Sequence, residues 1–309
     1  MRKRRLDSVY QLAKADERVV FIGSDLGPGV LDDMKKEMPR RYFMEGVSEQ
    51  HIIGMAAGMA MEGFIPYVNT IATFLTRRCY EQVALDLCLQ DLPVRLIANG
   101  GGAVYAPLGP THLAVEDIAI MRALPNMAIV APCDAEEMQR FMATTLDWPH
   151  PIYIRLGKGG EKVVSRAEHG FEIGKAITLR EPGTGLFITT GVMTQIALMA
   201  AEKLAEEQIS CGVLHMHTVK PLDHAALGHW LPKVKGVVTV EEHTRIGGLG
   251  SAILEFCNDE MPQQSLKIAR IGIPDRFARQ YGSQDSLLEH WGISVKSLSD
   301  TMRKQIDAS

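Results

Sequence analysis

Short apolar runs, each closed by a turn residue, recur along the whole chain. Val19–Ile22 is the first, and Gly23 follows it directly. Runs of this length, rich in branched residues and bounded by turn formers, predict buried strands. The same pattern predicts further strands at 66–68, 94–98, 128–131, 152–155, 186–189, 211–215 and 237–240.

Longer segments with helical periodicity separate these runs, at 80–90, 134–146 and 193–207. Strands that alternate with helices predict parallel sheets covered on both faces, so the expected class is α/β. The pattern lapses into glycine and charged residues from Gly157 to Gly170 and then restarts. We therefore expect two doubly wound domains, at 1–165 and 166–309.

Composition narrows the possible partners. The 309 residues are 46% hydrophobic and carry a net charge of −4, which gives no electrostatic reason to expect nucleic acid or a membrane surface. No stretch approaches the roughly twenty apolar residues of a membrane span, and a cytoplasmic protein is expected. The basic run Met1–Arg5 is expected to be a solvated tail. Five cysteines without Cys-x-x-Cys spacing predict reduced, mostly buried thiols.

Three segments carry candidate chemistry. Glu49, in Gly46-Val-Ser-Glu49, opens an apolar run rich in glycine and alanine that extends to Met61. Phe74 follows 25 residues later, and His112 ends Gly109-Pro-Thr-His112. Taken singly, these residues would be read as a first-turn helix acid, a core aromatic and a loop hydrogen-bonder.

Together, in this order and spacing, the three segments resemble the pyrimidine-binding half of thiamine-diphosphate enzymes of the transketolase and deoxyxylulose-phosphate synthase group. The resemblance implies that Glu49 hydrogen-bonds a pyrimidine nitrogen and drives the ring to its imino tautomer. It implies that Phe74 stacks on the pyrimidine and that His112 moves protons at substrate hydroxyls. A pyrimidine-binding domain followed by a transketolase C-terminal-type domain is then expected.

The same resemblance suggests further contacts. Asp25 and Leu26, in Gly23-Ser-Asp-Leu, match the segment that supports the cofactor, although a helix cap and a core residue are equally compatible. Lys158 replaces an arginine of the family and, with Arg77, is a candidate anion contact on the substrate side. The segments 219–223 and 240–250 look like family segments that stabilise the assembly.

The metal-diphosphate signature of that group, Gly-Asp-Gly with a downstream Asn, does not occur in the sequence. The resemblance therefore implies a split transketolase in which an N-terminal partner subunit ligates Mg²⁺ and the diphosphate, with no metal ligand in this chain and an α2β2 assembly. A β subunit of a 2-oxo-acid dehydrogenase decarboxylase and a non-catalytic regulatory subunit remain alternatives.

Two other patterns have simpler readings. His215-Met-His217 places two imidazoles on alternate positions of a predicted strand, but a structural role is favoured because no third ligand is evident. Gly247-Gly-Leu-Gly250 is expected to be a close-packing turn before a helix, and Asn99-Gly-Gly-Gly102 a tight turn after a strand.

Overall fold

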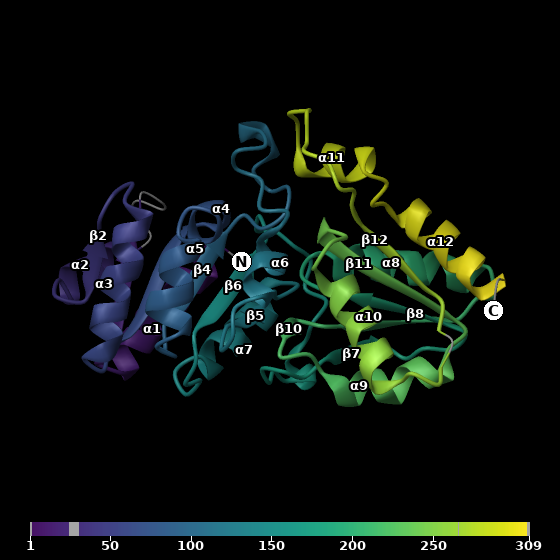
Figure 1. Ribbon diagram of the computed structural model, residues 1–309, viewed down its shortest axis with the longest axis horizontal. Coiled ribbons are helices and arrows are strands. Elements are labelled where there is room, and N and C mark those ends of the chain that lie inside the picture. The colour runs from purple at the N-terminus through teal and green to yellow at the C-terminus, as the bar shows by residue number, and fades with distance from the viewer. Residues whose placement is uncertain (1, 25–30, 265, 308–309) are drawn as a thin grey trace.

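The computed structural model describes residues 2–24, 31–264 and 266–307. Two sheets lie side by side, with the first half of the chain around one and most of the second half around the other (Figure 1). The predicted α/β class is confirmed. β6 ends at Leu156 and β7 begins at Ile177, so the chain passes from one sheet to the other within 157–176. The boundary at 165/166 stays a prediction.

The first half of the chain supplies six strands and the helices that cover them. Its elements are α1 (Arg2–Ala15), β1 (Val19–Gly23), α2 (Asp32–Glu37), β2 (Tyr42–Met44), α3 (Glu49–Met61), β3 (Ile65–Ile71), α4 (Ala72–Thr76), α5 (Tyr80–Gln82), the π-helical turn η1 (Val83–Cys88), β4 (Arg95–Asn99), the 3-10 turn η2 (Ala106–Leu108), α6 (Asp117–Arg122), β5 (Ala128–Val130), α7 (Ala135–Thr144) and β6 (Ile152–Leu156).

The second half supplies the other six strands. Its elements are the 3-10 turn η3 (Ala167–His169), β7 (Ile177–Arg180), β8 (Gly185–Thr189), α8 (Met193–Glu206), β9 (Cys211–His215), β10 (Thr218–Lys220), α9 (His224–Trp230), the 3-10 turn η4 (Leu231–Lys233), β11 (Gly236–Thr244), α10 (Leu249–Glu260), β12 (Ile268–Ile273), α11 (Gln284–His290) and α12 (Val295–Asp307).

The strand order of the first sheet is β10-β5-β6-β4-β3-β1-β2, and that of the second is β12-β11-β8-β9-β7. All pairings are parallel except β10 with β5 and β7 with β9. Apolar side chains of α3, η1 and α6 fill one face of the first sheet, and those of α1, α2 and α7 fill the other. In the second sheet α8 and α12 cover one face, and α9 and α10 cover the other.

The structure adds detail on the N-terminal segment, on β10 and on the cysteines. The backbone of the basic segment 2–5 belongs to α1 and is helical, and the solvation of this segment stays a prediction. β10 joins the first sheet although it follows three strands of the second sheet, which links the two halves. No described helix is long and apolar enough to cross a membrane. The cysteines are free as predicted, four of them buried and Cys257 partly so.

Candidate functional site

The candidate residues gather at the carboxyl edge of the first sheet. Ser24 follows β1, Glu49 follows β2, and Phe74 follows β3. These strands are neighbours and parallel, so the segments that leave them emerge together. Ligands of open α/β sheets bind at this edge, because several loops and helix starts converge there.

Glu49 is the first residue of α3, and only 3% of it is exposed. Gly46, at a φ of 66°, turns the chain between β2 and this helix, a conformation that favours glycine. Oε1 of Glu49 accepts a hydrogen bond from the Ser24 hydroxyl at 3.2 Å. Oε2 accepts one from Nη1 of Arg78 at 2.7 Å. The carboxylate is thus buried and held at both oxygens.

Phe74 lies between Arg78 and His112. The Arg78 guanidinium carbon is 4.0 Å from the centre of the Phe74 ring. The His112 ring meets Phe74 edge-on, with centroids 5.4 Å apart and an interplanar angle of 66°. Nδ1 of His112 lies 2.9 Å from the Thr111 hydroxyl. The structure therefore brings Glu49, Phe74 and His112 into one connected group through Arg78.

The remaining candidates lie elsewhere or outside the description. Arg77 forms an ion pair with Glu116 at 3.1 Å and donates to the Thr111 carbonyl, so it ties down the segment that carries His112. Lys158 is exposed beyond the end of β6, and no contact among the described residues joins it to the Glu49 group. Asp25 and Leu26 lie outside the described residues.

A buried ion pair supports the segment that carries His112. Nε of Arg155 donates to Oδ2 of Asp117 at 2.7 Å, and the Tyr153 hydroxyl donates to the same oxygen at 2.8 Å. Arg155 also donates to the Glu242 carbonyl at 2.8 Å. This last bond joins the first sheet to β11 of the second within the chain, and the assembly role of segment 240–250 stays a prediction.

The Glu242 side chain continues that support. Its Oε1 accepts the backbone N–H of Ala103 at 2.8 Å, and burial raises the pKa of this carboxyl. A Cβ at Gly102, where φ is 71°, would overlap the Glu242 carboxyl group. In place of the tight turn predicted at Asn99–Gly102, the chain bends at Gly100 and then bridges to Ala114 through Gly101 and Gly102. The close approach of Glu242 explains one of these glycines.

Gly248 has a comparable role before α10. A Cβ there would overlap Oε2 of Glu241, and this carboxyl accepts the N–H groups of Leu249 and Gly250. The close-packing turn predicted before a helix is confirmed. Burial raises the pKa of Glu241 to about 7, and the backbone donors moderate that rise.

The two histidines of the predicted His-Met-His pair have protein partners. His215 lies 2.9 Å from Glu137 and 2.9 Å from Thr194, and His217 stacks on Phe171 with ring centroids 3.9 Å apart. Cys133, Glu137 and His215 are close enough to hold a metal ion together. The backbone N–H of Cys133 and the His215 ring both bond Oε2 of Glu137, so this oxygen is committed to contacts within the protein.

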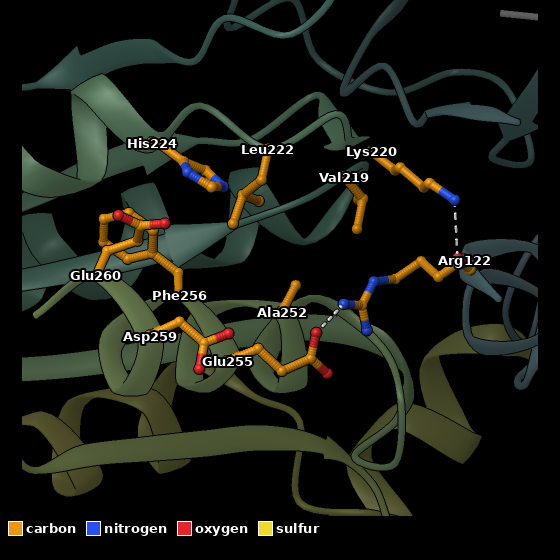
Figure 2. A pocket seen from close by; sticks show the side chains of 10 residues that line it. All are labelled: Arg122, Val219, Lys220, Leu222, His224, Ala252, Glu255, Phe256, Asp259 and Glu260. Atoms are coloured by element: carbon orange, nitrogen blue, oxygen red, sulfur yellow. Dashed lines mark hydrogen bonds and ion pairs between the residues drawn. The ribbon is translucent and has the colours of Figure 1, made fainter. Parts of the chain in front are cut away.

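A cavity of about 270 Å³ lies between the two halves of the chain (Figure 2). Arg122 points across it toward Glu255 of α10 and donates to the Gly247 carbonyl at 2.7 Å. Lys220 of β10 donates to the Arg122 carbonyl at 2.9 Å. Among the lining residues only Arg122 comes from the first half of the chain, and none belongs to the Glu49 group, so this cavity is separate from the candidate site.

Some residues of the site were not found from the sequence. Arg78 stands beside Arg77 in the turn after α4, but the sequence does not indicate which of the two reaches Glu49. Asp117 and Arg155 are 38 residues apart, and no local pattern pairs them. For the contact between Arg78 and Glu49, the sequence signal was the pair of adjacent arginines, Arg77 and Arg78.

Residues 1–160 match the family model described as "Transketolase, pyrimidine binding domain", and residues 174–298 match "Transketolase, C-terminal domain". The first match covers the strands β1 to β6 and the buried Glu49, and the second match covers the strands of the other sheet. The chain belongs to the transketolase family.

Similar proteins include single subunits of transketolases. One is "6-deoxy-6-sulfo-D-fructose transketolase subunit SqwH" of Clostridium sp. (strain MSTE9), 34% identical, covering 96% of this chain and 92% of that protein. Another is an apulose-4-phosphate transketolase subunit of Phocaeicola vulgatus, 33% identical, covering 97% and 95%. The "1-deoxy-D-xylulose-5-phosphate synthase" of Cyanothece sp. is 40% identical over 95% of this chain, which spans 46% of that enzyme.

Solved structures give the same relationship. The structure described as "Split gene transketolase, inactive beta4 tetramer" superposes with a TM-score of 0.91 at 32% identity, covering 99% of this chain and 98% of that one. Transketolase of Campylobacter jejuni matches with a TM-score of 0.81 at 20% identity, and there the chain covers 46% of the longer protein, which is a likeness of fold. The chain is thus similar along nearly its whole length to subunits of split transketolases.

Proposed function

We propose that this chain is the pyrimidine-binding subunit of a split, thiamine-diphosphate-dependent transketolase that transfers a two-carbon ketol unit from a ketose to an aldose. The observation that carries the proposal is the position of Glu49: a carboxylate 3% exposed, at a helix start, joined through Arg78 to the ring of Phe74. A carboxylate edge and a flat apolar face are the two features that an aminopyrimidine requires.

Glu49 is the residue that would activate the cofactor. When bound, thiamine diphosphate supplies the nucleophilic carbon that attacks the donor carbonyl. Glu49 would hydrogen-bond the pyrimidine nitrogen and share a proton with it, and the rigid start of α3 would hold the carboxyl in place. Phe74 would orient the ring by stacking.

His112 is proposed to handle protons at substrate hydroxyls. Its ring lies beside Phe74, and its Nδ1 faces the Thr111 hydroxyl at 2.9 Å, so Nε2 remains the nitrogen for a substrate contact. An imidazole titrates near neutral pH and can give and take a proton in one catalytic cycle. Thr111 would fix the ring orientation.

Lys158 and Arg77 are proposed to contact the anionic group of the substrate. The Lys158 side chain is exposed, whereas the Arg77 side chain already has a protein partner. Lys158 is exposed at the carboxyl edge and can meet a phosphate or sulfonate as a point charge. Arg77 is bound to Glu116, so an anionic substrate would have to share its guanidinium. Sugars with an anionic end group, including sulfonated or phosphorylated ones, fit this assignment.

A partner subunit is proposed to hold the diphosphate and Mg²⁺, in an α2β2 assembly. Two relatives of nearly the same length are named as subunits, which supports a divided enzyme. Asp25 and Leu26 are proposed to support the cofactor at the end of β1.

The proposal is tested by reconstitution. The subunit that co-purifies with this chain is identified, and ketol transfer is measured with each subunit alone and with both, in thiamine diphosphate and Mg²⁺. Turnover is expected only from the mixture, and turnover by this chain alone would contradict the split assignment. Preference for pyruvate over ketose donors would instead support a 2-oxo-acid decarboxylase subunit.

A further inference from the structure

Arg78 occupies both contacts that the proposed function gives to the aminopyrimidine ring. Its Nη1 donates to Oε2 of Glu49 at 2.7 Å, and its guanidinium carbon lies 4.0 Å from the centre of Phe74. A guanidinium is planar and carries N–H donors along its edge, and it stacks on aromatic faces. The aminopyrimidine is recognised by the same two properties, a flat face and a polar edge.

We propose that Arg78 is a stand-in for the pyrimidine in the cofactor-free chain, and that cofactor binding displaces its guanidinium from Glu49 and Phe74. This inference rests on the proposed function, because it assigns the ring site to these two residues. It adds a state in which the Arg78 side chain covers the ring site, here called the cap. The Arg78 guanidinium and the pyrimidine ring cannot occupy this site at the same time.

The burial of Glu49 gives a physical reason for the cap. A carboxylate that is only 3% exposed is costly to leave unpaired, and the Ser24 hydroxyl at 3.2 Å is a neutral partner. Arg78 supplies a positive charge to this carboxylate. The cofactor-free chain thereby keeps its charged catalytic group compensated.

Arg78 is also placed so that it can leave. Its side chain is 42% exposed, and it lies in the short connection between α4 and α5. Withdrawal into solvent therefore requires rotation of one long side chain, with no change in the buried core. Glu49 and Phe74, which belong to helices α3 and α4, would stay in place.

The cap lowers the apparent affinity for the ring. A ligand that binds only the uncapped fraction has its dissociation constant raised in inverse proportion to that fraction. The bond between Glu49 and Arg78 is charge-assisted, which makes it stronger than a hydrogen bond between neutral groups. Removing it is therefore expected to strengthen binding of a pyrimidine ring about tenfold or more.

The test uses the full chain without its partner and, as probe, the hydroxymethyl aminopyrimidine half of thiamine, which has no diphosphate. Binding is followed by ligand-observed NMR titration for wild type, Arg78→Met and Arg18→Met. Arg18 is a surface arginine paired with Asp16 at the opposite edge of the sheet. The dissociation constant is expected to fall about tenfold for Arg78→Met and to stay unchanged for Arg18→Met.

Adding Phe74→Ala to Arg78→Met is expected to reverse the gain, which locates the binding at the ring site. An Arg78→Met chain that binds the probe no more tightly than wild type, or that shows a gain insensitive to Phe74→Ala, would overturn the cap. Should Arg78→Met not fold, Arg78→Lys is used: lysine lacks the flat face, so tighter binding than wild type is again expected, and equal binding overturns the proposal.

Failure of the cap and failure of the proposed function are separable. If the reconstituted enzyme loses ketol transfer on Glu49→Gln but Arg78→Met binds the probe no more tightly, only the cap is wrong. If Glu49→Gln leaves ketol transfer unchanged, the proposed function is wrong regardless of the binding result.

Discussion

Asp117 and Arg155 form an ion pair that is buried on both sides, with side chains 0% and 6% exposed and 2.7 Å between Oδ2 and Nε. Arg155 spans from this pair to the Glu242 carbonyl in the other half of the chain. The charge pair lies within the first half of the chain, and the bond from Arg155 to Glu242 anchors it, together with the segment that follows His112, to the second half.

Asp117→Asn is expected to destabilise the chain strongly, because it leaves the Arg155 charge buried without its counter-ion. Removing one partner of a buried pair costs about 3–5 kcal/mol. Chemical unfolding of the isolated chain measures the loss. Glu207→Gln, which breaks the solvent-exposed pair of Glu207 with Arg303, is the matched control and should change stability far less. Equal effects of the two variants would contradict the structural role of Asp117.

Phe74→Leu is expected to weaken cofactor binding by the reconstituted enzyme while leaving the chain folded. Leucine keeps the apolar contact but loses the flat ring. Contact between two aromatic rings contributes about 0.5–1.5 kcal/mol beyond the burial of apolar area, so the dissociation constant of the cofactor should rise roughly two- to tenfold. Titration of thiamine diphosphate against activity measures it. Phe64→Leu, just before β3 and at the opposite edge of the sheet, should leave the constant unchanged.

His112→Asn is expected to lower kcat/KM for ketol transfer by about a hundredfold, the general scale of a lost acid–base group. Asparagine can hydrogen-bond but cannot carry a proton near neutral pH, so one limb of the pH–rate profile should also vanish. His51→Asn, on the exposed side of α3, is the control. A profile that keeps both limbs would show that His112 does not handle the proton.

Acid stability should depend on His243. Burial lowers the pKa of this imidazole to about 4, whereas the unfolded chain takes up the proton near pH 6.5. Its contribution to stability is therefore lost as pH falls below 6.5, because the unfolded state binds the proton first. Glu241, with a raised pKa, acts in the opposite direction between about pH 4.5 and 7, so variants must be compared at each pH.

His243→Asn is accordingly expected to lose less stability than wild type between pH 6.5 and 5, by about 1.6 kcal/mol, because the unfolded imidazole is half protonated at pH 6.5 and almost fully protonated at pH 5. Unfolding curves at the two pH values measure the difference. Parallel losses in variant and wild type would show that His243 is not the group that titrates.

The alternation of apolar runs with helical segments was enough to predict the α/β class, because burial on both faces gives parallel strands an unbroken apolar sequence. β10 was not predicted. It has three residues, pairs antiparallel with β5 and is placed by contacts between the two halves, which leave no local periodicity.

In the candidate site, too, some residues could be predicted from the sequence and others could not. Glu49, Phe74 and His112 were chosen from motifs, and the structure brings them together. The roles of Arg77 and Arg78 could not be predicted from the sequence. The conformation of the turn between α4 and α5 decides which of these two arginines faces Glu49. The conformation of this turn depends on how it packs against the rest of the chain, and the local sequence pattern does not show that packing.

The account depends above all on the carboxyl group of Glu49, and Glu49→Gln in the reconstituted enzyme tests it most directly. Glutamine keeps the shape and hydrogen bonding of the side chain but cannot share a proton with the ring. Ketol transfer is expected to fall by about a hundredfold or more, on the usual scale for acid–base groups, while Glu45→Gln, on the exposed approach to α3, leaves it unchanged. Full ketol transfer by Glu49→Gln would contradict the account.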